Sequence, residues 1–254
     1  MNTFFVYGAP GTGKTTLACT APTPILILDV DGKASSMHNI SHLIADGRVT
    51  VRTLDVPLSS GTLRNKLLTI KSPQVSMPMG LLKLADIITE LEGKCEYKTV
   101  VLDSLTLTNE HIKRYLLFAT KKVQLSYEGW AFVQDTYINL FESLQKIAVE
   151  NIIIIAHERI DKDTKVDAST KFVIRPLIES SMKDKFGIFF NEIYYCFVTD
   201  TDGNTKWKVR TSPNEDIIAR TSLNLDTIEE PNISQILIKG KLSKVNKTVS
   251  KKVT

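Results

Sequence analysis

Nine residues near the start of the chain combine glycines with a lysine and threonines at a fixed spacing. They read Gly8-Ala9-Pro10-Gly11-Thr12-Gly13-Lys14-Thr15-Thr16, a match to G-x-x-x-x-G-K-[ST], and they follow the apolar run Phe4 to Tyr7. Glycines let backbone N–H groups turn inward and hold phosphate oxygens at the start of a helix. The pattern is typical of a phosphate-binding loop, in which Lys14 contacts the β- and γ-phosphates and the Thr15 hydroxyl binds Mg²⁺. We therefore expect a nucleoside triphosphate site.

Three further apolar runs end in a polar residue and alternate with helical patterns. Ile25 to Leu28 precedes Asp29, Thr99 to Leu102 precedes Asp103, and Ile152 to Ala156 precedes His157. Apolar spacing predicts helices over residues 81–91, from 105 to about 122, and over 129–149. Continuous apolar strands that alternate with helices predict an α/β fold with a mostly parallel sheet and helices on both faces.

The pattern changes after residue 158. Residues 158–170 are polar and predict a surface loop, whereas Ile193 to Thr199 and Thr205 to Thr211 predict an antiparallel hairpin. A short strand near Ile217 to Ala219 and a helix from Pro231 to Lys239, closed by Gly240, complete the prediction. We expect one domain over 1–240 whose part 158–230 is rich in β-structure. Residues 57–80 predict an irregular connection with one helical turn near Leu63 to Ile70.

Charge is unevenly distributed along the chain. The net charge is +4, but residues 239–254 hold six lysines and no acid, so the rest of the chain carries −2. We expect the tail 241–254 to be disordered, either simply solvated or adding sequence-independent phosphate contacts. No window approaches about 18 apolar residues, the N-terminus lacks a secretory signal pattern, and three scattered cysteines fit no metal or redox spacing. These features favour a cytoplasmic protein without membrane partners.

Each strand end offers a candidate for triphosphate chemistry, because a parallel sheet binds its ligand at the carboxyl ends of its strands. Asp103 is the candidate Mg²⁺ ligand together with Thr15. Asp31 is preferred over Asp29 as the carboxylate that orients the attacking water. His157 is a candidate donor to the γ-phosphate or to a water, and a core histidine is the alternative.

The late strands offer candidates for the cation that stabilises the transition state of triphosphate hydrolysis. Arg220, with Lys208 and Arg210, is the candidate that would reach a phosphate in the same or a neighbouring subunit. The alternative is that all three are solvent-exposed charges on the strands with no role in catalysis.

The order of these motifs resembles the RecA-type ATPase core. The residues that carry the resemblance are Gly8 to Thr15, Leu28-Asp29-Val30-Asp31-Gly32, Val100 to Ser104, and Ile153 to Glu158. The chain is more closely similar to short phage-encoded nucleotide-binding proteins of the AAA-named, RecA-like group, which act as single-strand annealing recombination proteins. That group shares Gly129-Trp130 and the late Thr211-Ser212-Pro213 with a basic residue, here Arg220. The resemblance spans about residues 4 to 240.

The resemblance implies ATP and Mg²⁺ as cofactors, with Asp103 as the Walker B acid, Asp31 as the water-activating carboxylate and His157 as the γ-phosphate sensor. It also implies single-stranded DNA contact by the loop after His157, self-association into a ring or filament, and a bacterial host cell. A single-strand-binding protein is a further candidate partner. Many relatives have Glu in place of Asp31 and often Lys in place of Arg220, and a shorter acid slows hydrolysis.

Two other functions remain open at the level of sequence. One is an ATP-switched assembly or binding module in which hydrolysis is incidental. The other is a P-loop kinase of a small molecule, although the chain shows no arginine cluster that would form a basic lid. The leading prediction is an ATPase that binds single-stranded DNA and promotes strand annealing or pairing in phage or prophage recombination.

Overall fold

The computed structural model describes residues 1–54, 79–122, 124–163, 171–179, 182, 185–201 and 203–250. The expected helical turn near Leu63 to Ile70 lies outside these residues. Among the helices described, none is both long enough and apolar enough to cross a membrane.

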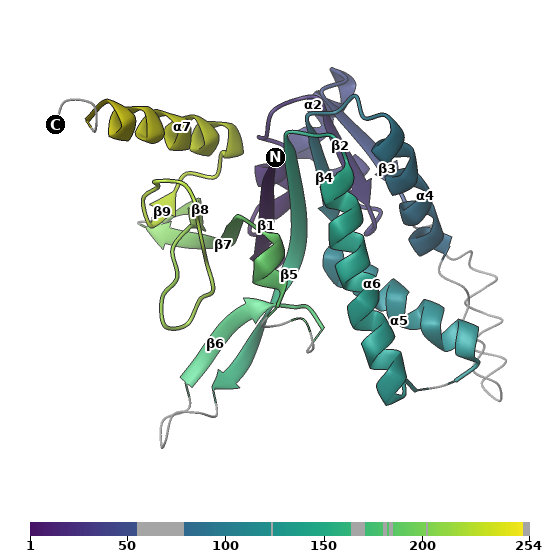
Figure 1. Ribbon diagram of the computed structural model, residues 1–254. Coiled ribbons are helices and arrows are strands. Elements are labelled where there is room, and N and C mark those ends of the chain that lie inside the picture. Colours follow the sequence, from purple (N-terminus) through teal and green to yellow (C-terminus); the bar gives the residue numbers. More distant parts are fainter. Residues whose placement is uncertain are drawn as a thin grey trace.

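A single sheet runs through the molecule, with helices on both sides (Figure 1). The strands stand in the order β3-β2-β4-β5-β1-β7-β8-β9, with β6 paired to β5 beyond the main path. All neighbours from β3 to β7 are parallel, whereas the pairs β7–β8, β8–β9 and β5–β6 are antiparallel. The strands are β1 Asn2–Gly8, β2 Ile25–Asp29, β3 Val49–Thr53, β4 Thr99–Asp103, β5 Asn151–Asp163, β6 Lys171–Pro176, β7 Glu192–Thr201, β8 Asn204–Arg210 and β9 Ile228–Glu229.

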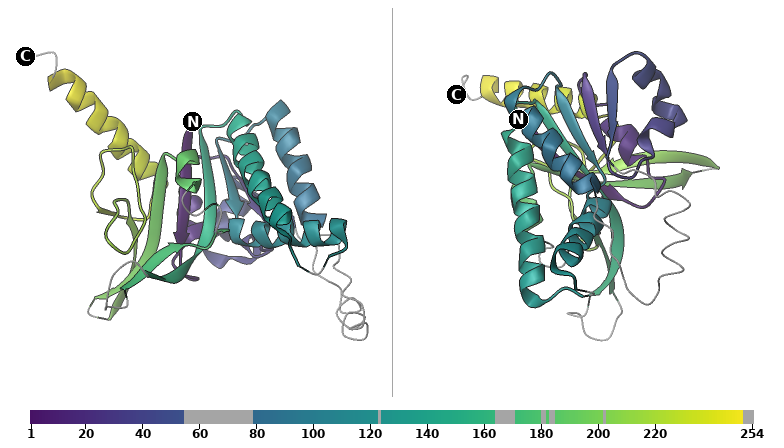
Figure 2. Two further views of the ribbon diagram at one scale, coloured as in Figure 1. Left: turned by 60° about the horizontal axis from the view of Figure 1, so that its bottom comes forward. Right: turned by 90° about the vertical axis from the view of Figure 1, so that its right-hand side faces the viewer.

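Strand β1 lies in the interior of the sheet and separates two apolar cores. Phe5 and Tyr7 face the core covered by three helices, and Phe4 and Val6 face the other core. The first group of helices is α4 Met79–Gly93, α5 Leu105–Thr120 and α6 Tyr127–Lys146, which lie together on one side (Figures 1 and 2). The second core packs against α1 Lys14–Ala18, α2 His38–Ala45 and the start of α7 Ile233–Ser250. Two short 3₁₀ turns, η1 Ala34–Ser36 and η3 Phe186–Phe189, complete the elements.

The predicted α/β architecture is confirmed. The sheet is mostly parallel, helices flank it, and the C-terminal strands are antiparallel, including the predicted hairpin that is now β7 and β8. Helix α2 and strand β3 were not predicted, because residues 38–53 mix polar and apolar residues without a clear period.

The predicted surface loop over residues 158–170 is wrong for its first six residues. Strand β5 continues to Asp163 and pairs with β6 in a two-stranded ribbon, from Glu158 opposite Pro176 to Asp163 opposite Lys171. The ribbon projects away from the sheet (Figure 1); Ile160 and Phe172 are exposed on one of its faces, whereas Val173 on the other face is buried. Hydrogen bonds between the two backbones hold this segment in a β-conformation, so its sequence does not need the alternating apolar pattern from which a strand is predicted.

Two smaller expectations near the C-terminus are also wrong. Ile217 and Arg220 make isolated bridges, to Ile174 and Ile193, in place of a strand near Ile217 to Ala219. Helix α7 does not end at Gly240 but continues to Ser250, so most of the tail expected to be disordered is helical. A Cβ at Gly240 would lie 2.9 Å from Leu223 Cδ2, so the glycine permits close packing of the helix and does not cap it.

Candidate active site

The loop between β1 and α1 has the geometry that the motif predicts. Gly13 precedes α1 with φ 78°, in the left-handed region that favours glycine. At Gly8, a Cβ would lie 2.2 Å from the carbonyl oxygen of Cys196, so only glycine lets β1 end against β7. The first helical turn begins directly at Lys14, and its free N–H groups face the loop.

Lys14 is buried within this loop. Its Nζ donates to the carbonyl oxygens of Gly8 at 2.9 Å and of Ala9 at 2.7 Å, and only 7% of the residue is exposed. Burial lowers the pKa of Lys14. The ammonium group is therefore held over the loop by two neutral carbonyls, and a phosphate oxygen would give it a stronger, charged partner.

Asp103 and Thr15 meet across the end of the sheet. The Thr15 hydroxyl donates to Asp103 Oδ2 at 2.6 Å, and Asp103 is 9% exposed at the end of β4. Burial raises the pKa of Asp103 to about 6, and the carboxylates of Asp31 and Asp29 add to the rise. A buried carboxylate with this shortage of positive charge is suited to a hard cation such as Mg²⁺.

The donor set around Asp103 also limits how a metal can bind. In the described part of the chain, no group of three or more His, Cys, Asp or Glu side chains is arranged to hold a metal ion. Mg²⁺ normally keeps few protein ligands and shares the rest with water and substrate phosphates. Thr15 and Asp103 fit this role beside the phosphate-binding loop.

Asp29 and Asp31 are separated by one residue but differ in their contacts. Both oxygens of Asp29 accept backbone N–H groups, from Gly32 at 2.8 Å and from Ala34 at 2.9 Å, and the residue is 1% exposed. Asp31 accepts the Ser104 hydroxyl at 2.9 Å, and both aspartates line the cavity over the loop. Asp29 therefore uses both oxygens to stabilise the turn, while Asp31, held by one hydroxyl, keeps acceptor capacity for a ligand in the cavity.

His157 lies next to the loop because β5 and β1 are in register, with His157 opposite Gly8. Its backbone N–H donates to the Thr106 hydroxyl at 3.0 Å, and no group in the described residues hydrogen-bonds its buried Nδ1. Burial and then the charge of Lys14 lower the pKa of His157, so the imidazole is neutral near pH 7. A neutral ring can donate from one nitrogen to a phosphate oxygen or a water.

Arg220 does not join this group. It bridges to Ile193 through the backbone, its Nη1 donates to the Gly187 carbonyl at 3.2 Å, and it does not line the cavity. Lys208 pairs with Glu230. A role for Arg220 in a neighbouring subunit's site stays a prediction.

The residues gathered at this edge of the sheet line a cavity of about 600 Å³. Sequence reasoning missed several of its members, among them Lys33, Asn39 and Trp207. Lys33 lies two residues after Asp31, so its position in the same turn was a signal that could have found it. Of the residues lining the cavity, Lys14 and Lys33 carry the positive charges.

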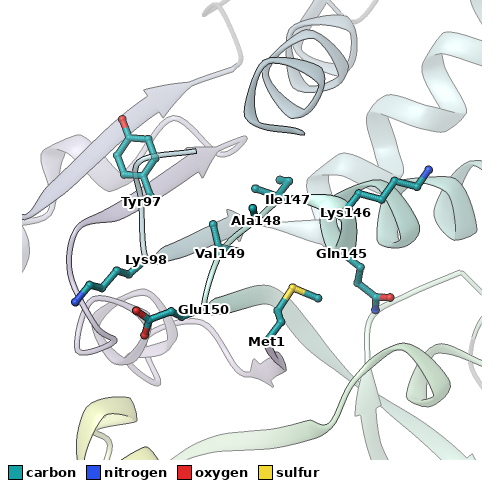
Figure 3. A pocket seen from close by; sticks show the side chains of 9 residues that line it. All are labelled: Met1, Tyr97, Lys98, Gln145, Lys146, Ile147, Ala148, Val149 and Glu150. Atoms are coloured by element: carbon teal, nitrogen blue, oxygen red, sulfur yellow. The ribbon is translucent and has the colours of Figure 1, made fainter. Parts of the chain in front are cut away.

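A second hollow of about 610 Å³ lies at the opposite end of the sheet (Figure 3). Its lining includes Met1, Lys98 and Glu150, which directly precede β1, β4 and β5. The charged ends of Lys98 and Lys146 lie on opposite sides of it and do not converge (Figure 3). The two hollows are similar in volume, so the side chains and not the size distinguish the candidate site.

A comparison with curated proteins found no match. Among solved structures, the flagellar accessory protein FlaH from Methanocaldococcus jannaschii is 11% identical, with a TM-score of 0.38, over 82% of this chain and 76% of that chain. A KaiC-like protein from Pyrococcus horikoshii OT3 is 13% identical, with a TM-score of 0.39, over 82% of this chain and 77% of that chain.

The family assignment comes from a model that covers most of the sequence. The family described as an AAA domain matches residues 1–223, which include the phosphate-binding loop, Asp31, Asp103 and His157. The chain therefore belongs to the AAA domain family and carries an ATPase-type P-loop domain.

Proposed function

We propose that this protein binds and hydrolyses ATP with Mg²⁺, and that it acts on single-stranded DNA in phage or prophage recombination. One observation supports the ATPase part above all others. The loop lysine, the Thr15–Asp103 pair, Asp31 and His157 line one cavity, although they lie on or just after four different strands.

Each residue has a separate task in this proposal. Lys14 and the loop N–H groups bind the β- and γ-phosphates, and Thr15 and Asp103 hold Mg²⁺, which when bound neutralises charge on the phosphate oxygens. Asp31, oriented by Ser104, positions the attacking water. His157 donates to the γ-phosphate or to that water, and Lys33 adds a second cation at the cavity wall.

The ribbon of β5 and β6 supports the DNA part of the proposal. Ile160 and Phe172 are exposed on it, and the pairing of Lys162 with Phe172 and of Ile160 with Ile174 places these side chains on one face. Bases stack on exposed apolar and aromatic side chains, while a lysine attracts the phosphate backbone. The same strand β5 carries His157 at the cavity, so nucleotide and DNA would contact one continuous element.

ATP turnover tests the first part. We expect slow Mg²⁺-dependent hydrolysis, loss of ATP binding in Lys14→Ala, and retained binding with reduced turnover in Asp31→Asn. An Asp31→Ala variant that still anneals DNA, beside an inactive Lys14→Ala variant, would instead favour an ATP-switched assembly module. Phosphorylation of a nucleoside in place of release of inorganic phosphate would contradict the ATPase.

DNA binding and size are measured under the same conditions. Single-stranded DNA should raise turnover and bind more weakly as salt increases, and Phe172→Ala should weaken DNA binding about 5- to 100-fold. Phe118→Ala, at another exposed aromatic residue on α5, is the matched control and should bind normally. Sizing of the protein with ATP and DNA tests the ring or filament. The DNA proposal fails if DNA neither binds at low salt nor changes turnover.

A further inference from the structure

Trp207 lies against the phosphate-binding loop although it comes from the opposite end of the sequence. It is on β8, and its Nε1 donates to the Gly11 carbonyl at 3.3 Å. A Cβ placed on Gly13 would lie 3.2 Å from its Cδ1, so the pyrrole edge of the indole packs on the loop. Despite these contacts 46% of the residue is exposed, so part of the indole remains open to a ligand.

The cavity over the loop has an apolar part that phosphate binding does not explain. The lysines, the carboxylates, Thr15 and His157 account for the triphosphate and its metal. The remaining wall includes the apolar residues Pro10, Leu17, Ala34, Met37, Trp207 and Pro231. Cavities of several hundred Å³ hold whole cofactors, and their apolar walls bury the apolar part of the ligand. A planar aromatic ring is the part of a nucleotide that such a wall would bury.

We infer that Trp207 forms a nucleobase subsite, in which the base of a purine nucleoside triphosphate stacks on the exposed indole. This inference rests on the proposed ATP site and names the part of it that distinguishes a nucleotide from a bare polyphosphate. The hydrogen bond to Gly11 and the contact with Gly13 hold the edge of the ring, which fixes its orientation before the ligand arrives. The C-terminal hairpin thereby completes a site that begins at residue 8.

The second tryptophan makes a clean spectroscopic test possible. The chain has two tryptophans. Trp130 lies on α6, with Lys113 Nζ at 5.9 Å from its ring, and does not line the cavity. In a Trp130→Phe background all tryptophan emission comes from Trp207. Adding ATP should change the emission, because a stacked base alters the surroundings of the indole. Inorganic tripolyphosphate, which has the charge but no base, should leave the emission nearly unchanged.

Affinity measurements separate stacking from phosphate binding. Calorimetry with Trp207→Ala should show ATP binding weakened about 5- to 100-fold, with tripolyphosphate binding nearly unchanged. Trp207→Phe should recover part of the ATP affinity, because it keeps an aromatic face. Circular dichroism and thermal unfolding establish that each variant is folded, which we expect because Trp207 is 46% exposed and not part of the core.

Two results would overturn the inference, and they differ from failure of the ATP site itself. Equal effects of ATP and tripolyphosphate on Trp207 emission, or equal losses of both affinities in Trp207→Ala, would show that the indole only supports the loop. If the unaltered protein bound neither ATP nor tripolyphosphate, the proposed ATPase would be wrong and the subsite with it.

Discussion

Two buried carboxylates, Asp103 and Glu192, lie in the same sheet but in opposite surroundings. Glu192 is 2% exposed at the start of β7 and accepts four hydrogen bonds. Ser222 donates from its backbone N–H at 2.9 Å and its hydroxyl at 2.6 Å, and the hydroxyls of Tyr194 and Thr221 donate at 2.8 and 2.5 Å. Asp103 has one such donor among the described side chains, Thr15, and two carboxylates as neighbours.

The difference separates a structural acid from one kept ready for a ligand. Four donors stabilise the charge of Glu192 without any further group, so nothing remains for it to bind. Asp103 lacks that compensation, and burial raises its pKa to about 6. An acid that lies in a cavity and has a strongly shifted pKa is a candidate for function, because a bound ligand can supply the positive charge that its protein neighbours do not.

The largest expected effect follows replacement of Glu192. Glu192→Ala removes the buried acceptor of four hydrogen bonds and should lower the free energy of unfolding by about 3 to 4 kcal/mol. Urea denaturation measures this change. Glu192→Gln keeps one acceptor oxygen and should lose less, while Glu230→Ala, at an exposed ion pair with Lys208, should change stability by less than about 1 kcal/mol. A small effect of Glu192→Ala on the free energy of unfolding would show that these four hydrogen bonds contribute little to stability.

For Asp103 we expect the opposite sign, which means that replacing the carboxylate raises the free energy of unfolding. Its pKa in the fold, about 6, lies above the ordinary value of 3.8, so the folded state favours the protonated form. Stability from this group is complete below pH 3.8 and is lost as pH rises through about 6. Asp103→Asn mimics the protonated form, so in metal-free buffer at pH 8 it should raise the free energy of unfolding by up to about 3 kcal/mol.

The pH profile of this variant provides the check. The gain should shrink as the pH falls from 8 to 4, and Mg²⁺ with ADP should stabilise the original protein but not Asp103→Asn. Thermal and urea unfolding at both pH values measure these differences. A gain that is independent of pH would mean that Asp103 is not the ionising group.

The sequence predicted the position of Asp103 because strand ends are encoded locally. A clean apolar run fixes where β4 ends, and parallel pairing then brings Asp103 beside Asp29 and His157 beside Gly8. The same logic predicted the order of strands and helices through residue 157, except for α2 and β3. Roles that depend only on a strand and its carboxyl end can be inferred from short-range patterns.

Contacts that depend on the C-terminal strands could not be predicted from the sequence. Glu192 finds its donors at 221 and 222, and Trp207 reaches Gly11 across 196 residues of chain. These contacts depend on the register of β7 and β8 and on a connection without regular structure, neither of which leaves a local period. For the same reason the sequence could not show that Arg220 does not line this chain's own cavity, since its backbone bridges to Ile193 and its guanidinium donates to the Gly187 carbonyl.

Asp29 offers an intermediate case between the two acids. It accepts backbone N–H groups from the turn before η1, yet burial still raises its pKa. Asp29→Asn keeps one acceptor and loses the other, so we expect a loss of about 2 kcal/mol in stability. Turnover of ATP should fall as well, because the turn also carries Asp31 and Lys33. An unchanged unfolding curve would show that the turn holds its shape without Asp29.

The smallest effect on stability should come from Ser104, which links Asp31 to the start of α5. Its hydroxyl donates to Asp31 and accepts the Leu107 N–H at the N-cap of the helix. Ser104→Ala should cost about 1 kcal/mol as a lost cap, and should lower kcat about 2- to 10-fold with little change in KM, because Asp31 loses its orienting donor. Ser126→Ala removes the corresponding cap of α6 and should cost similar stability without affecting turnover. Equal turnover in the two variants would show that Ser104 acts only as a cap and that Asp31 needs no partner to hold its position.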